Sequence, residues 1–155
     1  MVLCLLAGGV FAENGEAGWL RYARLAPEAA NKYAGLPATV IICGDSALLQ
    51  SAQVELLRGI HGMLNRTLTV RKGIPTEPAI VVGTIEQIRA MDGSFRPGED
   101  VQSDAYELLS EEIHGHKAIV IAGGSERGAL YGTFAFLSKI ARGKSVADLH
   151  EASRS

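Results

Sequence analysis

The 155-residue chain carries a formal net charge of −2, and 47% of its residues are hydrophobic while 21% are charged. This length fits one globular domain and falls far below the roughly 250 residues of a TIM barrel. The composition excludes a disordered chain, and the lack of any Lys/Arg cluster argues against a nucleic-acid partner.

The chain opens with a short apolar run, residues 1–12, which ends in small residues up to Ala12. Such a run predicts a signal peptide, although the usual positively charged start is missing, and it is too short for a membrane-spanning helix of about 20 residues. We therefore expect a secreted protein with no membrane span. The alternative is a buried first strand.

The two cysteines predict no disulfide framework. Cleavage after Ala12 would remove Cys4 and leave Cys43 unpaired. Because Cys43 ends an apolar run, we expect it to be a buried thiol that acts as a small hydrophobic side chain.

Three segments share one plan, in which an apolar run is followed by a glycine turn and then by a helix. The apolar runs are Thr39–Cys43, Ala79–Val82 and Ala118–Ala122. Their helices extend to about Leu64, from Thr84, and to about Ala141. Thr84 and Gln87 fit a capping box. The expected inner stripes are Leu49, Ala52, Leu56, Ile60 and Met63 in the first helix and Leu130, Phe134, Leu137 and Ile140 in the third.

Shorter signals fill the remaining chain. Thr67–Val70 predicts another strand, and Tyr106–Ser110 predicts a strand joined to Lys117–Ala122 by a hairpin with Gly115 in its turn. The fold class is therefore α/β (α+β), with a mixed β-sheet and about three helices. After Arg142 the chain turns polar, so residues 143–155 are expected to form a linker or an abrupt end and not a closing element.

Local motifs for cofactor chemistry are weak, and we predict neither a cofactor nor a metal. The glycines from Gly123 to Gly128 follow a strand but lack the Gly-x-Gly-x-x-Gly spacing, and Glu126 would repel a phosphate at the helix start. His114 and His116 lack a third ligand nearby. The adjacent pair Glu111 and Glu112 would point to opposite faces of a strand, unlike the paired carboxylates of a glycosidase.

Asn65 begins an Asn-Arg-Thr sequon at the predicted end of the first helix. The motif indicates possible N-glycosylation of a secreted protein. The alternative is a helix C-terminus with Asn65 in the left-handed conformation.

Two stretches resemble the N-terminal domain of α-glucuronidases of glycoside hydrolase family 67. The first contains Trp19-Leu20-Arg21-Tyr22, and the second runs from Asp104 to Leu137 and includes Arg127-Gly128-Ala129-Leu130-Tyr131-Gly132. The second is also similar to the hexosaminidase-like accessory domain that precedes a TIM barrel in several glycosidases. The first stretch narrows the resemblance to α-glucuronidases.

Members of this family remove 4-O-methylglucuronic acid from xylo-oligosaccharides with inversion, and their acid and base lie in a TIM barrel after this domain. The resemblance implies that residues 13–142 form a non-catalytic accessory domain and that residues 143–155 lead towards the barrel. It implies no catalytic residue in this chain, and xylo-oligosaccharide would be bound only through the barrel. The motif residues would then serve structure or a domain interface: Trp19, Leu20, Arg21, Tyr22, Arg127, Gly128, Tyr131 and Gly132.

Gly128 and Gly132 lie one helical turn apart, so their shared face could approach either the domain's own sheet or the barrel. Two other functions stay open. One is a free-standing carbohydrate-binding module, and the other is an accessory domain of another barrel glycosidase such as a β-hexosaminidase. If a partner domain is missing, we expect the isolated chain to self-associate.

Overall fold

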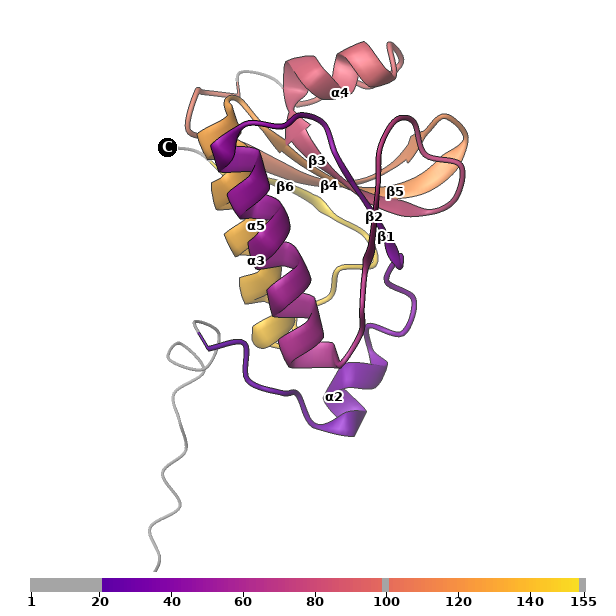
Figure 1. Ribbon diagram of the computed structural model, residues 1–155, viewed down its shortest axis with the longest axis vertical. Helices are drawn as coiled ribbons and strands as arrows, with labels where there is room; N and C mark the ends of the chain where they lie inside the picture. Colours follow the sequence, from indigo (N-terminus) through magenta and orange to yellow (C-terminus); the bar gives the residue numbers. More distant parts are fainter. Residues whose placement is uncertain (1–20, 99–100, 154–155) are drawn as a thin grey trace, which may run out of the picture.

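A computed structural model describes residues 21–98 and 101–153 (Figure 1). Within them, six strands form one sheet in the order β2-β1-β3-β5-β4-β6. The strands are β1 (Thr39–Ile42), β2 (Thr69–Arg71), β3 (Ala79–Thr84), β4 (Tyr106–Ile113), β5 (His116–Gly123) and β6 (His150–Ala152). The helices of these residues are α2 (Pro27–Asn31), α3 (Ala47–Leu64), α4 (Ile85–Met91) and α5 (Glu126–Ala141).

The sheet is mixed, as the sequence predicts. β2, β1, β3 and β5 run parallel, while β4 pairs antiparallel with β5 on one side and with β6 on the other. The continuous Val and Ile runs lie in the central strands, where side chains are buried on both faces. α3 and α5 lie side by side over one face, and α4 lies on the opposite side of the sheet (Figure 1).

The packing of α3 confirms its predicted inner stripe. All five predicted residues, Leu49, Ala52, Leu56, Ile60 and Met63, are fully buried in the core cluster beneath the helices. Asn65 ends the helix at φ 54°. This is the left-handed conformation that was one of the two interpretations of Asn65.

Of the four residues predicted to form the buried stripe of α5, two are buried and two are not. Leu137 and Ile140 are buried, but Leu130 and Phe134 are only partly covered. The helix turns Gly128 and Gly132 towards the sheet, and Phe136 is buried on that same side. Because glycine permits this close approach, the buried stripe is rotated away from Leu130 and Phe134.

The second face of the sheet is covered by α4 and the loop after it. Ile88 and Phe95 pack there over Ile41, Val81 and Val120. The predicted capping box is present, since Gln87 N donates to Thr84 Oγ1 (3.1 Å) and Thr84 N donates to Gln87 Oε1 (2.9 Å).

The β4–β5 hairpin is tighter than predicted. His114 (φ 49°) and Gly115 (φ 77°) alone form the turn, so Glu111–Ile113 and His116 extend the two strands. Two consecutive residues with positive φ match the twist of antiparallel strands. No helix among the described residues is long and apolar enough to cross a membrane.

The segment after Arg142 differs from the expected linker. Val146 and Leu149 are buried in the core, and β6 pairs with Glu107–Leu109 of β4. The domain therefore extends to β6, and this part of residues 143–155 closes the sheet. A three-residue edge strand of sequence His-Glu-Ala has no apolar alternation by which it could be predicted.

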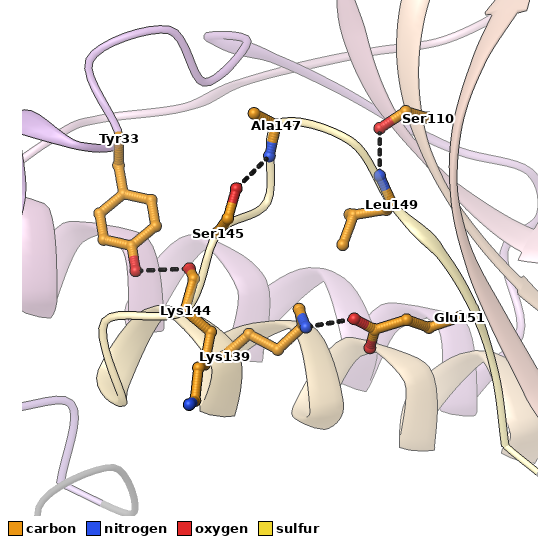
Figure 2. Close-up of polar contacts among 8 residues, drawn as sticks. All are labelled: Tyr33, Ser110, Lys139, Lys144, Ser145, Ala147, Leu149 and Glu151. Atoms are coloured by element: carbon orange, nitrogen blue, oxygen red, sulfur yellow. Dashed lines mark hydrogen bonds and ion pairs between the residues drawn. The ribbon is translucent and has the colours of Figure 1, made fainter.

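Polar contacts hold this closing segment against three different parts of the chain (Figure 2). They are the bond from Tyr33 Oη to Lys144 O (2.8 Å), the bond from Leu149 N to Ser110 Oγ (2.8 Å), and the ion pair of Lys139 with Glu151. Contacts from before β1, from β4 and from α5 together fix the path of the chain after the last helix.

Candidate functional site

The first family motif is only partly described, because Trp19 and Leu20 lie outside the described residues. Tyr22 is 5% exposed and adopts φ 48°. Its hydroxyl donates a 2.6 Å hydrogen bond to Glu55 Oε2 on α3, and the Arg58 guanidinium lies 5.2 Å from its ring centroid. Burial, followed by the Glu55 contact, raises the pKa of the Tyr22 hydroxyl above its usual range.

Two glycines of α3 make room for Tyr22. A Cβ at Gly62 would lie 2.7 Å from the Tyr22 carbonyl oxygen, and one at Gly59 would lie 2.6 Å from Leu137 and 3.2 Å from the Tyr22 ring. Leu25 N donates to Met63 O (2.9 Å) just beyond. The described part of this motif therefore fastens the entering chain to α3 and has the surroundings of a structural anchor.

The second family motif fastens α5 to the sheet. A Cβ at Gly128 would lie 2.3 Å from the Ala105 carbonyl oxygen, and one at Gly132 would lie 2.8 Å from Ile121 and 3.0 Å from Tyr106. Of the two surfaces that sequence analysis considered for these glycines, the structure places the domain's own sheet against them.

Arg127 and Tyr131 of the same motif point away from the sheet. Arg127 Nη1 lies 3.8 Å from Asp104 Oδ2 in an exposed ion pair, which contributes little to stability. Tyr131 is 46% exposed. These two side chains are therefore available to a partner surface, whereas Gly128 and Gly132 are not.

The carboxyl ends of β1, β3 and β5 meet at one edge of the sheet, where ligands bind in many α/β folds. Here side chains already cap the N-termini of the helices. Ser46, Thr84 and Ser125 cap the three helices that begin there, and the Glu126 carboxylate lies beside Gln87 at 3.5 Å. Because the carboxylate of Glu126 would repel a phosphate at the N-terminus of α5, its position argues against a nucleotide site.

The glycines of the turn before α5 lie directly against other backbone atoms. A Cβ at Gly124 would lie 2.0 Å from the Gln102 carbonyl oxygen, and one at Gly123 would lie 2.1 Å from Ala129 N. The glycines therefore serve close packing of backbone on backbone.

The histidine and glutamate pairs of the hairpin form no cluster. His114 Nε2 lies 2.7 Å from the Met91 carbonyl oxygen, and His114 N donates to Asp92 Oδ2 (2.8 Å). Glu111 and Glu112 alternate along β4 at its partly exposed end. Throughout residues 21–98 and 101–153, no group of three or more His, Cys, Asp or Glu side chains could hold a metal ion.

Cys43 lies between the sheet and α4, where it packs on the second core cluster. Burial raises the pKa of its thiol to about 12. A Cβ at Gly83 would lie 2.6 Å from the Cys43 Cβ atom, so the thiol is closely packed. These surroundings are those of an inert thiol and not of a nucleophile.

One functional group was missed by sequence reasoning. Glu107 on β4 is only 3% exposed. Its Oε1 accepts a hydrogen bond from Gly98 N (2.8 Å), while Oε2 is buried with no hydrogen-bond partner among the described residues. Burial raises the pKa of this carboxyl. The only sequence signal is an acidic residue within the apolar start of β4, Tyr-Glu-Leu-Leu.

Asn65 is exposed at the end of α3, and its Oδ1 accepts a hydrogen bond from Arg24 (3.3 Å). Glycosylation would use the other amide atom, Nδ2. The left-handed conformation and the sequon are therefore compatible with one another.

The fold is a small mixed α/β domain in which the described parts of both motifs are packed against its own helices and sheet. Residues 18–136 match the family described as Glycosyl hydrolase family 67 N-terminus. The chain belongs to this family of N-terminal domains.

Curated relatives agree with that assignment. The chain is 34% identical over 149 residues to alpha-glucuronidase A of Emericella nidulans, a match that covers 93% of this chain and 17% of the relative. It is 35% identical over 152 residues to the alpha-glucuronidase of Hypocrea jecorina, covering 92% and 18%. It is 36% identical over 135 residues to a probable alpha-glucuronidase A of Aspergillus fumigatus, covering 85% and 16%. The chain thus spans less than one fifth of the length of these relatives.

A solved structure supports the fold alone. It is a family GH115 4-O-methyl-alpha-glucuronidase with specificity for decorated arabinogalactans, with TM-score 0.51 and 22% identity. The match covers 68% of this chain and 14% of that structure.

Proposed function

We propose that this chain is the accessory domain of an α-glucuronidase that removes glucuronic acid, or its 4-O-methyl ether, from xylo-oligosaccharides during xylan degradation. The observation that carries the proposal is the match itself. At 34% identity the chain is covered over 93% of its own length by a fungal alpha-glucuronidase A, yet it accounts for only 17% of that protein.

In this proposal the domain supports a catalytic domain on the same polypeptide and contributes no catalytic group. The chemistry of the described residues agrees with that role. A glycosidase needs two carboxyl groups roughly 5 to 10 Å apart across a sugar-binding cleft. Glu107 is enclosed beneath the Gly98 loop, while Glu126 lies against Gln87 at the start of α5. Each of these two carboxyls accepts a hydrogen bond from within the domain.

The test compares this chain with a longer polypeptide. The 155-residue chain is expected to release no glucuronic acid from aldouronic acids, whereas the chain followed by the remainder of the Emericella nidulans relative is expected to release it. Release by the chain alone would contradict the non-catalytic role. Specific binding of xylo-oligosaccharide by the chain alone would favour the carbohydrate-binding module instead.

Secretion belongs to the same proposal, because polymeric xylan is broken down outside the cell and its oligosaccharides are first released there. It predicts a mature chain that begins at Glu13, which sequencing of the N-terminus of protein from the culture medium would test. In a eukaryotic host it also predicts a glycan on Asn65, seen as a mass loss on enzymatic deglycosylation that Asn65→Gln abolishes. An unprocessed Met1 on protein from the medium would contradict it.

A further inference from the structure

The helical layer on one face of the sheet ends at α5, although the sheet continues beyond it. α5 packs on β3, β5 and β4, and β6 is the next strand after β4. A helix with its side chains is about 10 Å wide and strands lie roughly 4.8 Å apart, so two helices cover about four of the six strands. A further element would therefore fit beside α5, over β4 and β6.

A hollow of about 500 Å³ lies at that place, between α5 and the strands β4 and β6. Leu108 of β4, which is 1% exposed, lies at its base, and Glu151 of β6 lines its far side. The residues that α5 contributes are spaced so that they share one side of the helix: Phe134, Ala135, Ser138, Lys139 and Arg142. We call this hollow the α5–β6 groove.

One end of the groove is aromatic. Phe134 of α5 and Tyr106 of β4 both line it and are only partly covered. Tyr106 lies beside Gly132, and Tyr131, which is 46% exposed, precedes Phe134 by one helical turn on the same side of α5. Aromatic side chains bury large areas at interfaces, so this end favours an apolar partner.

The other end of the groove, at the C-terminus of α5, is cationic. Arg142 and Lys144 are exposed there, and neither forms an ion pair with an acidic side chain of residues 21–98 and 101–153. Lys139 is already paired with Glu151 (Figure 2). The groove thus carries an excess of positive charge in a chain whose formal net charge is −2, which suits a partner with acidic side chains.

The chain leaves the sheet beside the aromatic end, since Ser153 N donates to the Tyr106 carbonyl oxygen (2.8 Å) directly after β6. We propose that the α5–β6 groove is the docking site for the catalytic part of the same polypeptide, which presents apolar side chains to the aromatic end and acidic ones to the cationic end. This inference rests on the proposed function, because it takes its occupant from relatives of which this chain matches only 16–18%. Polypeptide that follows Ser153 begins at the groove and can cover it without a long connection.

The experiment labels single thiols in this chain, alone and in the chimera with the remainder of Emericella nidulans alpha-glucuronidase A. Ser138→Cys places a thiol in the groove, and Ser51→Cys places one on the exposed side of α3 as the matched control. Both substitutions exchange one small side chain for another, and circular dichroism melting of the isolated chain verifies that each variant folds. Maleimide labelling, read by peptide mass spectrometry, follows each thiol separately.

Joining the chain to the remainder is expected to slow labelling at position 138 at least about tenfold and at position 51 less than about twofold, since labelling follows the population of the undocked form. Adding Arg142→Glu/Lys144→Glu should remove most of the protection at position 138, relative to the isolated chain with the same substitutions, because the reversed charges repel an acidic partner. Lys72→Glu/Arg89→Glu makes the same charge change at exposed positions outside the groove and should leave the protection intact.

Equal labelling of position 138 in the isolated chain and in a chimera that releases glucuronic acid would overturn the docking site and leave the proposed function standing. A chimera that protects position 138 but releases no glucuronic acid would support docking of the remainder and overturn the proposed function. Protection that appears in the isolated chain, either as its concentration rises or on addition of xylo-oligosaccharide, would assign the groove to a second copy or to a sugar and overturn the proposal.

Discussion

A Cβ atom on Gly128 would lie 2.3 Å from the carbonyl oxygen of Ala105. That oxygen cannot retreat easily, because it also accepts a hydrogen bond from Gly124 N (3.0 Å) at the turn before α5. The helix of the second family motif is thus held against the sheet by contact between two backbones, and a side chain at position 128 would separate them.

Gly128→Ala is therefore expected to lower the free energy of unfolding by about 1–2 kcal/mol. Overpacking typically costs roughly 1–3 kcal/mol, from which the better helix propensity of alanine recovers at most about 1 kcal/mol. Urea unfolding followed by circular dichroism measures the change. Gly35→Ala is the control, because nothing lies within 4 Å of its Cβ position and its φ is not positive. An unchanged midpoint for Gly128→Ala would show that the contact with Ala105 relaxes freely.

Tyr22→Phe is expected to lower the free energy of unfolding by about 1–2 kcal/mol, since the variant loses one hydrogen bond to the carboxylate of Glu55 but keeps the ring. The ring would still pack over Gly59 and beside Arg58. Thermal and urea unfolding of the isolated chain test this. Tyr131→Phe, at an exposed position, should change stability by less than about 0.5 kcal/mol. Equal effects of the two substitutions would remove Tyr22 as an anchor of the entering chain.

The elements that sequence reasoning predicted are those whose signals are local. The apolar runs of β1, β3 and β5, the capping box at Thr84 and the left-handed Asn65 each depend on neighbouring residues only. The short helix α2 and the edge strand β6 were missed because neither has an apolar period. Their positions follow from tertiary contacts, such as the bond from Tyr33 to Lys144.

For the family motifs, too, tertiary contacts could not be predicted from the sequence. Sequence reasoning identified Gly128 and Gly132 as points of close approach, but it could not decide which surface approaches them. The rotation of α5 that these contacts impose left Leu130 and Phe134 half-covered, contrary to helical periodicity alone. The burial of the Glu107 carboxyl could not be predicted either, because it depends on a contact with Gly98, which lies in a loop nine residues earlier in the sequence.

Cys43 is expected to resist thiol reagents in the folded chain. At pH 8 a thiol with a pKa of about 12 is ionised to roughly 1 part in 10⁴, and only the thiolate is a good nucleophile. In a Cys4→Ser background, Ellman's reagent should react at least about 100-fold faster in 6 M guanidinium than in buffer. Rapid reaction under native conditions, with an unchanged circular dichroism spectrum, would contradict the buried position of the thiol.

Glu107 predicts a specific pH dependence of stability. Its pKa is raised in the folded chain, so the folded state favours the protonated carboxyl. The unfolded chain releases this proton near pH 4.3, below the pH at which the folded chain does, so stability falls as pH rises through that interval. At lower pH both states bind the proton, and at higher pH neither does, so the contribution is constant on either side.

Glu107→Gln should remove this decline. Its amide oxygen can still accept the hydrogen bond from Gly98 N, but the side chain no longer titrates. The difference in unfolding free energy between the unsubstituted chain and the variant should therefore shift in favour of the variant as pH rises from about 4 to neutrality. Glu111→Gln on the same strand, where the side chain is not enclosed, is the matched control. Parallel pH profiles for the unsubstituted chain and Glu107→Gln would contradict the prediction. They would mean that folding does not raise the pKa of the Glu107 carboxyl.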